Sequence, residues 1–309
     1  MATIDSKTAA EPCRGRIQQR QWEQLSRGLY VPRDSPLSAV LRGWQLVLPE
    51  SAAFTSLTAA EVRGWWLPET IPHPVFAAVP VGERYPERKG ILVCRHPRPV
   101  PTETVHGLRV TTGSETLLAA ARDLGLLDLV ILGDSALRVG HCTRDELQAT
   151  AAKQRRGAPR LRTVLPLLDD RSESPWESVI RVLHVAAGID VEPQKKIFDS
   201  SGRFVARADL WLVGTRRIHE YDGDVHRDRQ VHRSDLARDR RLIEIDWQRM
   251  GFTSVQLRHD DASIIATVDR LLGRRWDPRR LAGWEALLHD SLFRPAGRAR
   301  ALRHWSRAM

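Results

Sequence analysis

The chain contains few cysteines, which argues against the protein classes that depend on thiol cross-links. Its 309 residues include three, Cys13, Cys94 and Cys142, which lie far apart. Their number is odd and no pair has the spacing of a zinc knuckle, so neither a disulfide framework nor a structural zinc site is indicated. Chains without disulfides are typical of reducing compartments, and we expect a cytoplasmic location.

Long apolar segments are also missing. The first residues, MATIDSKTAAEPCRGR, lack the apolar core of a signal peptide, and we expect residues 1–15 to be disordered. The most apolar stretch, LLAAARDLGLLDLVILG, is interrupted by Arg122, Asp123 and Asp128. A membrane span needs about 20 predominantly apolar residues, so the sequence predicts no membrane-spanning segment, and no membrane is expected among the partners.

What the chain has in excess is basic charge. It carries 48 Lys and Arg against 38 Asp and Glu, a formal net charge of +10. Such a surplus favours a polyanionic partner, with nucleic acid first and an anionic membrane surface second. The alternative is an arginine-rich composition whose only effect is solubility, and charge alone does not decide between the two. The length suits about two domains.

The first half of the chain mixes strands and helices. The runs GLYVP, PVFAAVP and KGILVCRH have strand character. Two helices are predicted where Thr112 precedes Glu115 and where Thr143 precedes Glu146, because this spacing is typical of a capping box. The basic stretch AAKQRRGAPRLR predicts a boundary or an exposed helix end.

The second half begins with a helix that precedes two strands. Ser174 suits the N-cap, Pro175 suits the first helical residue, and Gly188 suits the end of the helix. The runs FVARADLWLVG and RRIHEYDG predict two strands joined by a turn at Gly214-Thr215.

Further elements complete a mixed pattern. We expect a long helix over about 229–250, a strand at FTSVQLRH, and a last helix, ASIIATVDRLLG, capped by Asp260 or Asp261. The order helix, strand, strand, helix, strand, helix predicts a mixed sheet flanked by helices. After Gly273 the chain is rich in arginine, with one short helix expected around Trp284.

Three acids stand at unusual places in the two predicted strands. Asp209 lies inside an apolar run, and Glu220 and Asp222 end the next run just before Gly223. Residues two apart share a face of a strand, so Glu220 and Asp222 point the same way. If the strands pair through the short turn, Asp209 lies beside Glu220. Converging carboxylates form a hard oxygen site that suits magnesium or manganese.

An ordinary explanation of these acids competes with the metal site. Asp209 could end a strand, and Asp222-Gly223 is a common turn pair. On spacing alone this alternative is the stronger one. Glu177 is a third candidate acid, although Ser174 to Glu177 also has the capping-box spacing, in which the glutamate bonds back to the cap amide.

A histidine and several arginines follow the acids. His226 could orient or activate water, since its ordinary pKa lies near neutrality, but a solvated surface histidine is equally consistent with the pattern. If the following segment is a helix, its arginines could contact phosphates, or they could form a salt-bridged face in which Asp235 pairs with Arg238. The candidate phosphate contacts are Arg227, Arg229, Arg233, Arg238 and Arg241.

These residues belong to strings that resemble a known family. The runs SPWESVIRVL, AGIDVEPQ, ADLWL, HEYDGDVH, SDLARDRRL and GFTSVQLRHDD resemble the very-short-patch-repair-like endonuclease domain of the PD-(D/E)XK restriction-endonuclease-like superfamily. Upstream, RGLYVPRD, TSLTAAEVRGWWLP, GLRVTTGSETLLAAARD and GDSALRVGHCTRDELQ resemble an AbiEi-type antitoxin module. The resemblance covers about residues 16–275.

The resemblance and the composition of the two ends together predict an α/β chain, α+β overall, with four parts. Residues 1–50 would hold a disordered N-terminus and a truncated winged-helix remnant, and 51–165 would form a smaller AbiEi-like α+β domain. Residues 166–275 would form the restriction-endonuclease-like nuclease domain, with a mixed sheet flanked by helices. Residues 276–309 would be a basic C-terminal tail.

The resemblance also assigns roles to the candidate site residues. Asp209 matches the central metal-binding aspartate, Glu220 the second acid and Glu177 the helical glutamate, so these three would hold Mg²⁺ or Mn²⁺. Asp222 stands where the superfamily often has lysine. His226 matches the histidine after Asp-Gly that is implicated in catalysis.

The missing lysine changes the expected chemistry, because water activation would then come from the metal, His226 or Asp222. Asp235 and Arg238 match the helix positions that brace the site.

Two functions remain open at this point. One is a metal-dependent DNA endonuclease or nickase that hydrolyses phosphodiester bonds, in a defence or toxin–antitoxin context. The other is a non-catalytic, antitoxin-like DNA-binding transcriptional regulator that retains the nuclease fold. The expected partners are DNA and a cognate toxin or antitoxin protein.

Overall fold

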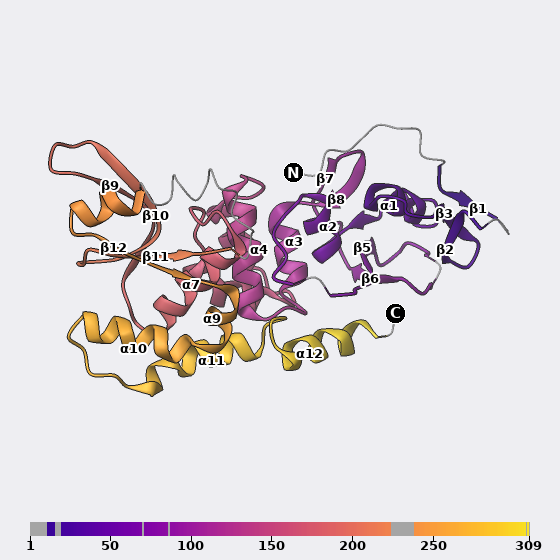
Figure 1. The fold of residues 1–309 in the computed structure, drawn as a ribbon. Helices are drawn as coiled ribbons and strands as arrows, with labels where there is room; N and C mark the ends of the chain where they lie inside the picture. The colour runs from indigo at the N-terminus through magenta and orange to yellow at the C-terminus, as the bar shows by residue number, and fades with distance from the viewer. Residues whose placement is uncertain are drawn as a thin grey trace.

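The protein has an α+β fold, as the sequence predicts. The computed structural model describes residues 11–15, 20–69, 71–85, 87–223, 238–306 and 308. Within these residues the strands form three sheets, two of them mixed. Figure 1 shows two sheets of the first half at one end of the molecule, the sheet of the second half at the other, and helices between them.

The first sheet is antiparallel and small. Its order is β1-β3-β2, with the bounds β1 Cys13–Arg14, β2 Trp22–Ser26 and β3 Leu29–Pro32. Helix α1, Leu37–Gln45, packs against it and shares a core that includes Leu29, Leu41 and Trp44. Residues 13–14 are therefore ordered in a strand, where the sequence predicts disorder up to residue 15.

The second sheet is mixed and has the order β6-β5-β4-β8-β7. Its strands are β4 Ala53–Phe54, β5 Val75–Pro80, β6 Ile91–His96, β7 Thr102–Val105 and β8 Leu108–Thr111. Helix α2, Ser56–Val62, packs against it. Strands β5 and β6 consist of VFAAVP and ILVCRH, which lie within the predicted runs PVFAAVP and KGILVCRH, so both predicted strands are confirmed.

A helical layer follows this sheet. It comprises α3 Gly113–Ala120, α4 Leu126–Arg138, α5 Arg144–Ala152, α6 Ala158–Val164 and the 3₁₀ turn η1 Leu165–Leu167. The capping box of Thr143 and Glu146 is confirmed. Thr112 is the N-cap of α3, so the predicted helix is confirmed, but its capping box does not form. The Thr112 amide donates to the Pro101 carbonyl oxygen at 3.0 Å, and the Glu115 carboxylate accepts from Arg155 at 2.7 Å.

Helix α7, Pro175–Ala186, connects this layer to the second half. Asp134 of α4 is fully buried and accepts from Ser178 Oγ and Arg181 Nη2 of α7, both at 2.6 Å. The helix ends before Gly188, whose φ of 65° is the left-handed conformation that glycine adopts most easily. Both ends of α7 are therefore as predicted.

The third sheet has the order β12-β11-β10-β9, with β12 parallel to β11 and the other pairs antiparallel. Its strands are β9 Val191–Phe198, β10 Phe204–Leu212, β11 Arg217–Tyr221 and β12 Gln248–Phe252. Strands β10 and β11 and their turn are confirmed, with φ of 80° at Gly214. The sequence does not predict β9.

The segment after β11 departs from the prediction. Residues 238–244 are helical, but the expected helix over 229–250 is wrong at its end, because β12 begins at Gln248 and pairs with β11. The strand predicted at FTSVQLRH is also wrong. Thr253 and Gln256 form a capping box there and begin helix α9, Ser254–His259. Helix α10, Asp261–Leu271, follows with Asp260 as its N-cap, as predicted.

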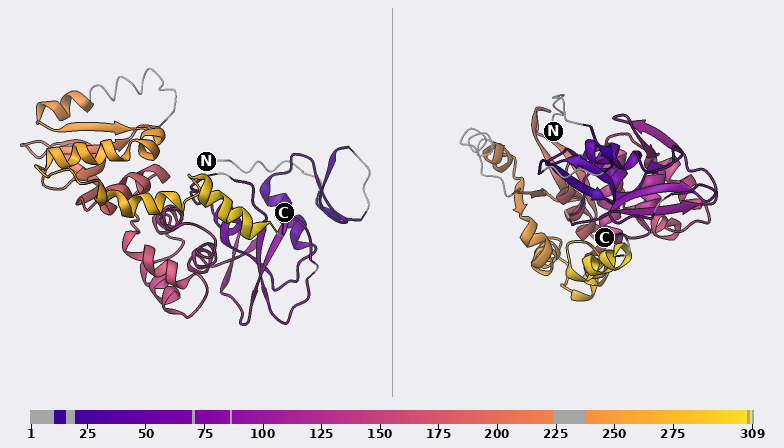
Figure 2. Two further views of the ribbon diagram at one scale, coloured as in Figure 1. Left: turned by 90° about the horizontal axis from the view of Figure 1, so that it is seen from below. Right: turned by 90° about the vertical axis from the view of Figure 1, so that its right-hand side faces the viewer.

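The basic segment beyond residue 276 is folded rather than a free tail. It forms the 3₁₀ turn η2 Pro278–Leu281, α11 Ala282–His289 and α12 Pro295–Trp305. Helix α12 runs back to the first half of the molecule (Figure 2), where Trp305 packs edge-on against Phe76 at 5.6 Å between ring centroids. The Leu292 amide also donates to buried Asp128 at 3.0 Å. No helix within the described residues is long and apolar enough to span a membrane.

Candidate carboxylate site on the third sheet

The third sheet brings the acids of β10 and β11 together. Leu210 pairs with His219, so Asp209 lies opposite Glu220, one residue further along the two strands. Directly opposed residues of an antiparallel pair share a face, and residues two apart along a strand do too. Asp209, Glu220 and Asp222 therefore point to the same side of the sheet, as the strand period predicts.

Asp209 is half-buried, and no Lys or Arg side chain within the described residues forms an ion pair with it. Its Oδ2 accepts from the Tyr221 amide at 3.1 Å. Burial, together with the negative charges of Glu177 and Glu220, raises the pKa of this carboxyl from 3.8 to about 7. The ionised form of Asp209 is therefore disfavoured in this environment, and an additional cation beside it would stabilise that form.

Glu220, by contrast, is fully engaged. It is 4% exposed and forms ion pairs with Arg238 and Arg249. Nη1 of Arg238 lies 3.1 Å from Oε2, and Nε of Arg249 lies 2.5 Å from the same oxygen. Two guanidinium groups therefore neutralise this buried carboxylate, which would otherwise be expensive to desolvate.

Arg249 also forms an ion pair with Asp222, so it bridges two of the predicted site residues. It lies on β12 opposite Ile218, which shares the face of Glu220. The next residue but one, Gly251, keeps this contact possible, because a Cβ there would lie 1.9 Å from Oδ2 of Asp222. The sequence did not identify Arg249, because its segment was predicted to be helical and a parallel partner strand leaves no local signal.

Glu177 reaches the site from the first turn of α7. Its amide donates to Ser174 Oγ at 3.2 Å, so the N-cap forms as predicted. Its carboxylate, however, accepts from the Glu173 amide at 2.8 Å rather than from the cap amide, and from Gln194 Nε2 at 2.7 Å. Burial raises the pKa of Glu177 as well.

Gln194 is a site residue that the sequence analysis missed. In the register of β9 and β10 it falls opposite Asp209, between the pairs Pro193–Leu210 and Lys195–Ala208. Its φ of 54° lies in the left-handed region, which is uncommon for a residue with a side chain. Its Oε1 is buried and has no hydrogen-bond partner among the described residues. A buried, unpaired carbonyl oxygen costs free energy, so this atom is a candidate ligand.

The donor atoms of these residues decide whether the expected metal ion could bind here. Within the described chain, no group of three His, Cys, Asp or Glu side chains is arranged to hold one. The donor chemistry nevertheless fits Mg²⁺ or Mn²⁺, because Asp209, Glu177 and the unpaired Oε1 of Gln194 supply hard oxygen atoms. Magnesium characteristically uses one or two carboxylates, with waters and substrate phosphates completing its shell. Glu220 is occupied by arginines instead.

The structure describes two of the five candidate phosphate contacts, Arg238 and Arg241. Arg238 is described, but its guanidinium braces Glu220 and donates to the Arg207 carbonyl at 2.9 Å, so it faces the acids rather than solvent. Arg241 is exposed. The other three, Arg227, Arg229 and Arg233, lie outside the described residues, as do the proposed catalytic His226 and the bracing residue Asp235.

The opposite face of β11 holds a buried histidine pair. His219 Nδ1 lies 3.0 Å from Nε2 of His184 on α7, and His184 Nδ1 lies 2.7 Å from the Ile180 carbonyl oxygen. Burial lowers the pKa of His184 to about 4 and lowers that of His219 too. Both rings are therefore neutral at pH 7, and the pair fixes α7 against the strand that carries Glu220.

The chain is similar to two known proteins, and the names of both carry no function. The chain is 25% identical over 260 residues to an uncharacterized protein of Mycobacterium tuberculosis strain CDC 1551 / Oshkosh, an alignment that spans 83% of this chain and 93% of the relative. The match to an uncharacterized protein of strain H37Rv has the same identity and coverage. No family model matches the chain. No solved structure gives a significant match.

Proposed function

We propose that the chain is a metal-dependent nuclease that hydrolyses phosphodiester bonds of DNA, with Asp209 at its catalytic centre. The observation that carries this proposal is the electrostatic state of Asp209. Its carboxyl is buried beside Glu177 and Glu220, its pKa is raised to about 7, and both arginines of the cluster sit on Glu220 instead. Strongly perturbed carboxylates without their own counter-charge are characteristic of functional sites.

In this proposal Asp209 and Glu177, with the Gln194 carbonyl oxygen, would hold Mg²⁺ or Mn²⁺. When bound, such an ion lowers the pKa of its water and neutralises charge on a phosphodiester. Arg249 holds Glu220 and Asp222 in fixed positions at the edge of the site. The resemblance to the repair-type endonucleases supports the same reading, and His226 keeps its proposed role in water activation.

The net charge of +10 supports DNA as the substrate, since a polyanion is attracted to such a surface and releases counterions when it binds. We further propose a cytoplasmic location and a defence or toxin–antitoxin role in which a cognate toxin or antitoxin protein is the partner. The proposed location rests on the cysteine pattern, and the proposed role and partner rest on the resemblance to the antitoxin module.

The ion pairs of Glu220 favour a second function, that of a non-catalytic DNA-binding regulator. Glu220, the proposed second acid, is already neutralised by two arginines, and the described residues include no preformed three-ligand group. A protein that retained the nuclease fold only as a DNA-binding regulator would show this saturation. The two proposals differ in whether the site binds metal.

Cleavage of supercoiled plasmid with Mg²⁺ or Mn²⁺ tests the nuclease proposal. Asp209→Asn should lower the rate by about 100-fold or more, because metal and charge stabilisation supply several kcal/mol at the transition state. Asp246→Asn is the matched control, since Asp246 is exposed and forms an ion pair with Arg216 at the other end of β11.

Calorimetric titration with Mn²⁺ separates the two functions. The nuclease proposal predicts saturable binding to the wild type and to Asp246→Asn, and its loss in Asp209→Asn. Intact DNA binding without saturable metal binding or cleavage would instead establish the regulator.

A further inference from the structure

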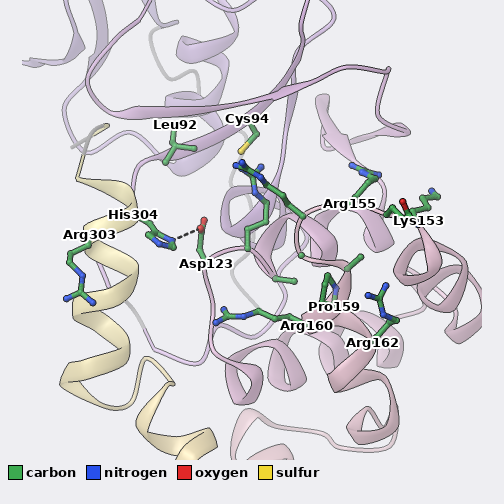
Figure 3. Close-up of a pocket in the computed structure, with 16 residues that line it drawn as sticks. Leu92, Cys94, Asp123, Lys153, Arg155, Pro159, Arg160, Arg162, Arg303 and His304 are labelled. Atoms are coloured by element: carbon green, nitrogen blue, oxygen red, sulfur yellow. Dashed lines mark hydrogen bonds and ion pairs between the residues drawn. The ribbon is translucent and has the colours of Figure 1, made fainter.

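A second site with a different chemistry lies in the first half of the molecule. It is an open pocket of about 1040 Å³, and none of its lining residues belongs to the carboxylate site. Figure 3 shows its walls: Leu92 and Cys94 from β6, Asp123 beyond α3, the segment from Lys153 to Arg162, and Arg303 of α12. Four parts of the sequence therefore meet around one space.

The pocket is strongly cationic. Among the described residues that line it, seven are Lys or Arg, while the lining acid is Asp123. Asp123 is already engaged, because its Oδ1 lies 3.2 Å from His304 Nδ1 and its Oδ2 accepts from Trp305 Nε1 at 3.3 Å. Glu115, which is buried nearby, pairs with Lys153 and Arg155. A large excess of positive charge remains.

Several of the guanidinium groups are held in place by contacts that leave their charge uncompensated. Arg160 donates through Nη1 to the Leu124 carbonyl oxygen at 2.7 Å, and Arg162 donates through Nη1 to the Ala151 carbonyl oxygen at 2.6 Å. Each guanidinium carries five N–H donors, so most of them stay free for a ligand. Fixing the side chains in advance lowers the entropy cost of binding an anion.

Two further arginines of the pocket have no such contact. Arg156 and Arg303 are exposed, and among the described residues neither side chain forms an ion pair or a hydrogen bond. They stand on different elements, the turn between α5 and α6 and the helix α12. The excess charge is thus presented from two walls of the same pocket.

The pocket also has apolar walls and a size that exceeds a single phosphate. Leu92, Ala121 and Pro159 line it between the arginines. Its volume is at the upper end of the range of about 300–1,000 Å³ that is usual for small-molecule sites. Guanidinium forks match phosphate geometry, while apolar surface suits a base or sugar. The combination selects a phosphorylated organic molecule over inorganic phosphate.

We propose that this pocket binds the phosphates of a nucleotide, which is presented either as a free nucleoside triphosphate or as the phosphorylated end of a nucleic-acid strand. The two sources share the chemistry that the pocket recognises. In either case α12 completes the site, so the C-terminal segment contributes to binding and does not only pack on the first half.

Fluorescence binding measurements on the full chain test this proposal. The probes are mant-ATP and a fluorescein-labelled, 5′-phosphorylated single strand of about ten nucleotides, a length within the usual range of single-strand sites. EDTA is included so that no divalent metal occupies the carboxylate site. The pocket variant is Arg156→Ala with Arg303→Ala. The control is Arg270→Ala with Arg275→Ala, which removes the same charge from exposed positions at the end of α10.

The pocket variant should bind at least one probe about tenfold or more weakly, since it loses two charge-assisted contacts to phosphate. The control should bind like the wild type. Loss confined to mant-ATP identifies a free nucleotide, and loss confined to the oligonucleotide identifies a strand end. The proposal is overturned if neither probe binds at up to about 1 mM, if both variants weaken equally, or if hexaglutamate competes as well as ATP does.

Discussion

The raised pKa of Asp209 gives the most direct test of the electrostatics on which the nuclease proposal depends. Replacing Asp209 with asparagine keeps the shape and leaves an oxygen that can accept from the Tyr221 amide, but it removes the ionisable group. The pKa of about 7 in the folded protein exceeds the ordinary value of 3.8, so the fold favours the protonated form. The wild type is therefore stabilised by this group at low pH and loses that contribution as pH rises from about 4 to 7.

The size of the effect follows from the same numbers. Since a tenfold change in proton affinity corresponds to about 1.4 kcal/mol, a rise from 3.8 to about 7 corresponds to about 4 kcal/mol. At pH 8 the asparagine variant should be more stable than the wild type by up to about this amount. At pH 4 the two proteins should be equally stable.

Thermal melting between pH 4 and pH 8 measures this difference. The control is Asp246→Asn, whose exposed carboxylate should give the same melting temperature as the wild type at every pH. Addition of Mn²⁺ at pH 8 should raise the melting temperature of the wild type and leave Asp209→Asn unchanged, because a ligand stabilises the state that binds it. A stability difference that does not vary with pH would refute the assigned environment of Asp209.

Two further predictions concern the neighbours of this site. Arg249→Met should destabilise the fold by about 3 kcal/mol, because it removes the ion pair between Arg249 and Asp222 and one of the two ion pairs that neutralise the buried Glu220 carboxylate. Urea denaturation that shows no change would contradict the bridge. The second concerns His184, whose folded pKa of about 4 lies below its ordinary 6.5. This contribution to stability should therefore be complete above pH 6.5 and fall by about 3 kcal/mol as pH drops to 4. The matching fall in melting temperature should be smaller in His184→Phe, and an unchanged fall in that variant would assign it to groups other than His184.

The parts of the site that the sequence predicted are those set by local geometry. The period of two along a strand places Glu220 and Asp222 on one face whatever the rest of the chain does. Glycine at 214, with φ of 80°, allows the short turn that brings Asp209 opposite Glu220. The ends of α7 were predictable for the same reason, since Ser174 and Gly188 act on backbone groups within one turn of themselves.

The parts that the sequence did not predict depend on partners that are distant in the chain. Residues 248–252 form a strand because β11 is available beside them, and Arg249 reaches Glu220 only through that pairing. Gln194 lies on a strand that was not predicted, and its role follows from its position opposite Asp209. The capping box of Thr253 and Gln256 is a local signal that favours a helix, and it prevails over the strand pattern of the run FTSVQLRH.

The sequence by itself determined the fold class, the face shared by Glu220 and Asp222, and the surplus of positive charge. Tertiary structure alone decided where that charge acts. It placed Arg238 and Arg249 on Glu220 and, within the part of the chain that the structure describes, left Asp209 without an ion-pair partner. It also folded the arginine-rich C-terminal segment into α12, which completes a cationic pocket on the first half. Periodicity and capping act over a few residues, whereas burial and charge compensation depend on which distant segments meet.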